Sequence, residues 1–209
     1  LTNQTWEGEL EIAVVGPTND PGKEITESHN ATWIDDKGSR NRADACNVGI
    51  EAINCDILLF TDDDVIPNTD WVAKLVRWFE RKEVAGVGGQ NWAPETDPFM
   101  AKLTDVAFGA KYVTAGTRYG KVEQGELVEV SHNPGCNSGY RKNVLDEIGG
   151  FESGCIGAED VVLDHKIRSK GYKLWFDPES IMPHRRRTPP ALLKQMRNYG
   201  YVRTLANSR

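Results

Sequence analysis

The 209-residue sequence lacks several features that assign many chains to a class directly. No apolar run approaches the roughly 18 to 20 residues that a membrane-spanning helix requires. Basic residues are not in excess, since 25 Lys and Arg stand against 31 Asp and Glu for a net charge of −6, and this argues against nucleic acid as a partner. The first residues show no basic segment followed by an apolar one, so no signal peptide is expected. A cytoplasmic location, in solution or peripherally at a membrane surface, is therefore expected.

Cysteine is also scarce. The four cysteines are scattered along the chain, without a Cys-x-x-Cys pair: Cys46, Cys55, Cys136 and Cys155. Zinc sites normally draw on such pairs, and an even count is weak evidence for disulfides in a chain of this length. The spacing does not suggest a zinc site, and it predicts reduced thiols with structural roles.

Short apolar runs alternate with amphipathic segments over a length that suits one domain, 1–209. The patterns predict strands at 11–15, 31–34, 57–60, 84–87, 127–130 and 172–176, and helices at 42–53, 71–79, 101–108, 142–148, 159–170 and 191–205. The strand at 84–87 is expected to end at Gly88 and Gly89. Alternating strands and helices imply βαβ units, so we expect an α/β fold with a mainly parallel sheet.

Three consecutive acids, Asp62, Asp63 and Asp64, follow directly after the buried strand predicted at 57–60. Ligands of open parallel sheets bind beyond the carboxyl ends of the strands, which is where these acids lie. Neighbouring anions repel one another unless a cation offsets them, and carboxylate oxygens suit Mg²⁺ or Mn²⁺. Such a metal would in turn hold a diphosphate. A solvated acidic turn that caps the next helix is the alternative.

Further polar groups lie in the second half of the chain. Glu159 and Asp160 begin a predicted helix, where they either cap the helix or offer a general base to a cleft. His184 follows a strand-like segment and is either a packing residue or a third metal ligand, because imidazole joins carboxylates around ions such as Mn²⁺. The arginine run at 185–187 would contact phosphates or form a solvated basic turn.

The order of these features resembles one family. Asp-x-Asp after a strand is followed by Gly-Gly-Phe at 149–151, Glu-Asp at 159–160, Gly-Tyr at 171–172 and a late histidine. This set, with matching segments at 42–50, 57–67 and 135–142, is similar to the family 2 glycosyltransferases of GT-A fold over about 10–205. The resemblance implies a Rossmann-like three-layer sandwich with a mainly parallel central sheet. In it, 1–90 would form the nucleotide-binding part and 91–209 the acceptor side.

The resemblance also implies roles for the acids. Asp62 and Asp64 would hold Mn²⁺ or Mg²⁺ together with the donor diphosphate, and His184 would add a metal ligand. Asp160 would take the proton of the acceptor hydroxyl, supported by Glu159. The implied reaction is a single inverting displacement.

Four residues are implied on the substrate side. Arg42 lies on the segment that approaches the nucleotide base, Asp63 lies within the diphosphate-binding acids, and Asn137 and Ser138 lie near the donor-sugar or acceptor pocket. The expected partners are a nucleotide-sugar donor, in the first place a UDP-sugar, and a glycan or lipid-linked acceptor. These partners would place the protein in polysaccharide or glycolipid biosynthesis.

Two departures from the family pattern keep other functions open. The chain starts too late to contain the family's first strand, and Gly16 and Pro17 stand where an acid often follows the second strand. An inactive glycosyltransferase-like module is therefore an alternative. A sugar nucleotidyltransferase would carry a glycine-rich basic loop near the start, which is not seen, and a plain carbohydrate-binding module would not need three acids after a parallel strand.

Overall fold

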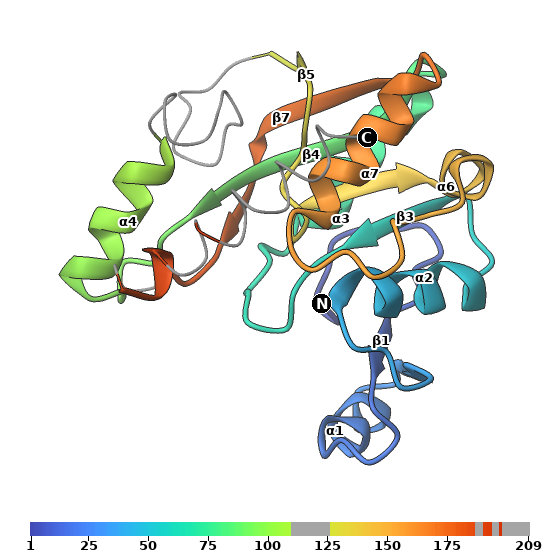
Figure 1. Ribbon diagram of the computed structural model, residues 1–209, viewed down its shortest axis with the longest axis horizontal. Coiled ribbons are helices and arrows are strands. Elements are labelled where there is room, and N and C mark those ends of the chain that lie inside the picture. Colours follow the sequence, from blue (N-terminus) through green and yellow to red (C-terminus); the bar gives the residue numbers. More distant parts are fainter. Residues whose placement is uncertain (110–125, 187–189, 194–196, 198–209) are drawn as a thin grey trace.

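The protein was studied as a computed structural model, which describes residues 1–109, 126–186, 190–193 and 197 (Figure 1). Its strands are β1 (Ala13–Gly16), β2 (Thr32–Asp35), β3 (Ile57–Phe60), β4 (Val84–Trp92), β5 (Val128–Val130), β6 (Ser138–Arg141) and β7 (Lys173–Pro183). Its helices are α1 (Gly22–Ser28), α2 (Arg42–Ala52), α3 (Trp71–Val76), continued by a 3₁₀ turn (Arg77–Glu80), α4 (Phe99–Gly109), α6 (Lys142–Ile148) and α7 (Glu159–Ser169).

Most predicted elements are present, with four differences, the first being that the strand predicted at 172–176 continues as β7 to Pro183. The helix α1 and the strand β6 were not predicted. The strand β4 does not end at Gly88 and Gly89 but runs through them to Trp92. The two glycines are needed for close packing rather than for a turn, because a Cβ on Gly88 would meet Asn133 at 2.7 Å and one on Gly89 would meet the backbone of Ser180. Of the helix predicted at 191–205, 191–193 and 197 are helical and the remainder lies outside the described residues.

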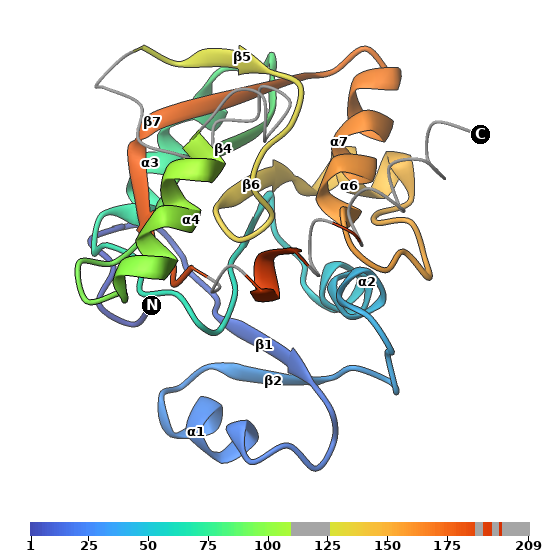
Figure 2. The ribbon, with the colours of Figure 1, turned by 60° about the vertical axis from the view of Figure 1, so that its left-hand side comes forward.

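The strands form two sheets. The larger has the order β3-β6-β4-β7-β5, and the smaller pairs β1 with β2 in parallel. In the larger sheet β3, β4 and β7 point the same way, whereas β6 and β5 run antiparallel to them, so this sheet is mixed. Figure 2 shows the smaller sheet and α1 set apart below the larger sheet. The expected α/β fold is confirmed.

Helices cover both faces of the larger sheet. On one face α3 packs through Trp71, Val72 and Leu75 against a cluster that includes Val87 and Met182. On the other face α6 and α7 pack against a second cluster, to which they contribute Val144, Leu145, Leu163 and Ile167. Burying this apolar surface on both faces yields the helix–sheet–helix sandwich.

The direction of the strands also sets the position of the functional residues. Because β3 and β7 run the same way, their carboxyl ends lie at the same edge of the sheet. The antiparallel β6 begins at that edge, so the loop that precedes it lies there too. The acids that follow β3, the histidine that follows β7 and the 131–137 loop are thereby brought together.

Candidate active site

Asp62, Asp64 and His184 form the one cluster of metal-binding type found among the described residues. One ligand atom from each lies within 4.8 Å of the others. Nε2 of His184 is 3.4 Å from Oδ1 of Asp64. Two carboxylates and an imidazole form a donor set that suits a divalent ion such as Mn²⁺. Asp63, between the two acids, is exposed and does not belong to the cluster.

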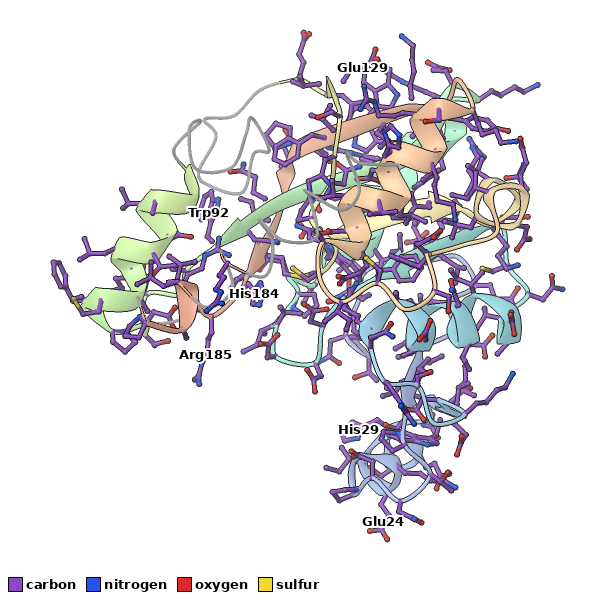
Figure 3. All side chains as sticks on the ribbon, in the orientation of Figure 1. Glu24, His29, Trp92, Glu129, His184 and Arg185 are labelled. Carbon is purple, nitrogen blue, oxygen red and sulfur yellow. The ribbon has the colours of Figure 1, made fainter. Side chains whose placement is uncertain are left out.

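Backbone pairing holds His184 beside the acids. Val65 and His184 form an antiparallel β-bridge, and the backbone N–H of His184 donates to the carbonyl of Trp92 at 2.8 Å. Figure 3 shows His184 next to the end of β4 and Arg185 pointing away from it. The carboxyl end of β4 and the segment that follows β3 therefore fix the third member of the cluster.

A buried thiol contacts the other ring nitrogen of His184. Sγ of Cys136 lies 3.4 Å from Nδ1, and it accepts a hydrogen bond from the side-chain amide of Asn91 at 3.0 Å. Burial raises the pKa of Cys136 to about 12, so the thiol stays neutral at physiological pH. With a proton on Nδ1 directed at the sulfur, the lone pair of Nε2 faces Asp64, which is the orientation that a metal ligand requires. All four cysteines are free, as expected.

Arg42 lies at the start of α2 and links the two acidic segments. Its Nη2 is 3.0 Å from Oδ1 of Asp62 and donates to the carbonyl of Gly135 at 2.9 Å. Its Nη1 is 3.5 Å from Oε1 of Glu159. The guanidinium therefore offsets part of the negative charge that the site concentrates.

Glu159 and Asp160 begin α7 directly after Ala158, which has a left-handed backbone (φ 55°). This conformation is unfavourable for a residue with a Cβ, and it turns the chain sharply into the helix. Burial, followed by the charge of Asp160, raises the pKa of Glu159, while Arg42 opposes the shift. Asp160 accepts the backbone N–H of Gly135 at 3.1 Å on Oδ2, and its side chain keeps 19% of its surface exposed.

Two predicted substrate-side residues are buried. Asn137 has no exposed surface and Ser138 has 1%. The amide of Asn137 donates to the carbonyls of Gln90 and Ser180 at 2.9 and 3.1 Å and accepts the indole N–H of Trp71 at 2.8 Å. These bonds join β4, β7 and α3, so they give Asn137 a structural role and do not support a substrate contact.

The arginine run is divided between surface and interior. Arg185 is exposed. Arg186 points inward, where its side chain donates to Asp105 at 2.6 Å and to the carbonyl of Asn91, and its backbone N–H donates to Asp97 at 2.9 Å. Position 187 lies outside the described residues.

Sequence reasoning missed two residues next to Asp160. His132 lies in the 131–137 loop, with Nε2 3.7 Å from Oδ2 of Asp160 and Nδ1 2.9 Å from Oδ2 of Asp164. Both are buried. The one signal in the sequence was the spacing of four between Asp160 and Asp164, which places both on one face of α7.

A groove of about 770 Å³ lies along α2, and neither the metal-type cluster nor Asp160 lines it. Its walls are the 36–41 loop, the face of α2 that carries Asp44, Asn47 and Glu51, and the turn around Ser153 and Gly154. The groove borders the N-terminal end of α2, where Arg42 lies.

The architecture is that of the GT-A glycosyltransferases. A mannosyltransferase from Pyrobaculum calidifontis, solved with GDP-Man and Mn²⁺, matches with a TM-score of 0.62 at 18% identity, over 96% of this chain and 63% of that one. The glucosyl-3-phosphoglycerate synthase of Mycobacterium tuberculosis, solved with Mn²⁺, UDP and glucosyl-3-phosphoglycerate, matches with a TM-score of 0.59 at 14% identity, over 90% and 65% of the two chains.

Residues 1–149 match glycosyl transferase family 2, and the chain belongs to that family. It is 24% identical over 150 residues to the O-antigen chain rhamnosyltransferase RfbN of Salmonella typhimurium, a match that covers 70% of this chain and 45% of that protein. The chain spans less than half the length of the curated relatives it matches. No helix among the described residues is long and apolar enough to cross a membrane.

Proposed function

We propose that this chain carries the catalytic site of a metal-dependent glycosyltransferase that moves a sugar from a nucleotide-diphosphate donor to an acceptor hydroxyl. The observation that carries the proposal is the convergence of a metal-type cluster and a separate, partly exposed carboxylate at one edge of the sheet. Asp62, Asp64 and His184 form the first, and Asp160 is the second. A donor that reaches from the cluster to Asp160 would have its diphosphate at the cluster and its reacting carbon toward Asp160.

In this proposal the cluster would hold Mn²⁺ or Mg²⁺, which would neutralise the departing diphosphate when bound. Asp160 takes the proton of the acceptor hydroxyl as the acceptor oxygen attacks the anomeric carbon on the side opposite the diphosphate, which inverts the configuration. Arg42, between Asp62 and Glu159, keeps the acidic segments together before the donor arrives. Glu159 supports Asp160 from the same helical turn.

We propose a chemical class for the donor and one for the acceptor. Structures of similar fold were solved with GDP-Man or UDP and with Mn²⁺, which supports a nucleotide-sugar, and we propose a UDP-sugar. The groove beside α2 would receive the base, because it is lined by hydrogen-bonding side chains and includes Asn41, which precedes Arg42 in the chain. We propose a glycan or lipid-linked acceptor, met in the cytoplasm or at a membrane surface; the name of the O-antigen chain rhamnosyltransferase relative supports the glycan class.

A thermal-shift screen tests this function without knowledge of the acceptor. UDP, GDP, CDP and dTDP are each added with and without Mn²⁺ to the wild-type chain and to Asp64→Asn. We expect one nucleotide to raise the unfolding temperature only when Mn²⁺ is present, and the variant to lose this shift, because ligands that bind the folded state stabilise it. A shift with no metal requirement, or one that survives in Asp64→Asn, would contradict the assignment of the cluster. No shift with any nucleotide would contradict the donor class.

A further inference from the structure

The 131–137 loop is held against the first two turns of α7 by a pair of aspartates. The backbone N–H of Gly135 donates to Asp160 at 3.1 Å, and the backbone N–H of Asn133 donates to Asp164 at 2.6 Å. Because Asp160 and Asp164 are four residues apart, they lie on the same side of the helix. His132 enters between them from the loop, so that one ring nitrogen faces each carboxylate.

Asp164 has the contacts of a buried anion. Its side chain has no exposed surface, and three donors converge on it: Nδ1 of His132 at 2.9 Å, the backbone N–H of Asn133 and the hydroxyl of Tyr140 at 2.9 Å. Burial raises the pKa of Asp164, and these hydrogen bonds oppose the rise. Burial, and then the charge of Asp164, holds the pKa of Tyr140 well above its usual range, so this hydroxyl stays a donor.

These contacts set the tautomer of His132. A carboxylate can only accept, so Nδ1 of His132 carries the proton that bonds to Asp164. In the neutral ring Nε2 then has a lone pair, and this lone pair faces Oδ2 of Asp160 at 3.7 Å. At that separation the two atoms form no hydrogen bond, and none can form while Asp160 is ionised, because neither atom then carries a proton. The separation closes favourably once Asp160 carries a proton, because Asp160 then donates and Nε2 accepts.

We propose that His132 is a positioning residue that receives the proton from Asp160, with Asp164 as the buried counter-ion. This inference rests on the proposed role of Asp160 as base. The acceptor O–H bond breaks and its proton goes to Asp160, while the C–O bond to the acceptor forms and the electron pair of the broken donor bond leaves with the diphosphate. The proton then passes from Oδ2 of Asp160 to Nε2 of His132. The resulting imidazolium lies between two carboxylates, and Asp160 is again ionised.

His132→Asn is the variant that isolates this role. The amide nitrogen of Asn reaches about where Nδ1 lies, so the bond to Asp164 is kept, while nothing replaces the ring nitrogen that faces Asp160. We expect kcat to fall, by less than the roughly 10²- to 10⁴-fold attributed to a general base, with the KM for the donor unchanged. His132→Gln extends past the site of Nδ1, so it serves as the control that loses the bond to Asp164 and lowers the unfolding temperature.

An NMR titration of the histidine rings tests the coupling without any turnover. The carboxylates that face His132 are those of Asp160 and Asp164 on α7, and Tyr140 of β6 donates to the second of them. We expect Asp160→Asn to lower the pKa of His132, since a facing anion stabilises the imidazolium. Glu129→Gln, whose carboxylate contacts Lys173, is the control that leaves this pKa unchanged.

A lowered His132 pKa together with a reduced kcat in His132→Asn supports the proposal. A pKa that does not move in Asp160→Asn, or a His132→Asn enzyme with full kcat, overturns it. The titration needs neither donor nor acceptor, so its failure is separate from failure of the proposed transferase function, which the nucleotide screen reports.

Discussion

The two halves of the candidate site are held in opposite ways. In the metal-type cluster the side chains of Asp62 and Asp64 keep 32% and 60% of their surface exposed. On the other side Asp160 keeps 19% and Asp164 none, and donors of the protein occupy their oxygens. The first half is completed by what binds to it, whereas the second is preorganised by the fold. Preorganised groups need little rearrangement during reaction, which suits the half to which we assign the proton transfer.

The largest expected effect comes from removing the base. Asp160→Asn should lower the rate of transfer by about 10²- to 10⁴-fold, the usual contribution of a general base. The Mn²⁺-dependent thermal shift by nucleotide should remain nearly intact, because Asp160 is not in the cluster. Initial rates and thermal shifts are measured on the same preparation. Equal loss of binding and transfer would place Asp160 in the metal-binding half and break the comparison.

A matched pair of aspartates tests the difference in how the halves are held. Asp164→Ala leaves three buried donors without their acceptor, at about 1 to 3 kcal/mol for each unsatisfied group. The free energy of unfolding should therefore fall by about 3 kcal/mol or more. Asp64→Ala changes an exposed side chain, so its free energy of unfolding should stay within about 0.5 kcal/mol of the wild-type value. Urea unfolding measures both, and similar losses in the two variants would remove the distinction.

His184→Ala should abolish the stabilisation that the cluster gains from bound metal and nucleotide. At a nucleotide concentration of 100 times Kd, binding stabilises the fold by about 2.7 kcal/mol, and this increment should disappear. Thermal shifts with Mn²⁺ and nucleotide measure it. His29→Ala, at an exposed position on the far side of the smaller sheet, is the matched control. A full shift in His184→Ala would leave the two aspartates as a sufficient metal site.

The smallest expected effect concerns Glu159, which borders both halves. Its pKa is raised in the folded protein by burial and by Asp160, so its ionisation opposes folding. Its contribution to stability is present below the unfolded pKa, about 4.3, and is lost as the pH rises through the folded value. Glu159→Gln should therefore become more stable relative to wild type between pH 4 and pH 7. Urea unfolding at both values tests this, and a difference that does not vary with pH would contradict it.

One half of the candidate site could be predicted from the sequence, and the other half could not. The metal-type cluster could be predicted, because Asp62 and Asp64 follow an apolar strand and the late histidine has a place in the family pattern. The partners of Asp160 could not be predicted. His132 meets α7 only because the strands on either side of its loop take their places in the sheet, and pairings between distant segments leave no local periodic signal.

Secondary structure shows the same division. The helix predicted at 142–148 has the bounds of α6, since Gly149 with φ 72° ends it as the sequence indicates. The strand β6 (Ser138–Arg141) was missed, because Ser-Gly-Tyr-Arg has little strand character of its own. It is extended because β3 and β4 pair with it on both sides. Gly139 permits this, since a Cβ there would collide with Leu59.

The bridge between Val65 and His184 also has a consequence for the chain as a polymer. A cation held by Asp62, Asp64 and His184 would tie together two points that more than half of the chain separates. The entropy lost by closing such a loop grows only slowly with its length, so a single ion can act over a very long segment. Such an ion binds the native state, in which the fold has already brought the two points together, and it is released when the chain unfolds, so it acts as a reversible cross-link of the folded protein. Chelation would therefore lower the free energy of unfolding of the folded chain as a whole, although the contacts that it removes lie at one edge of the larger sheet.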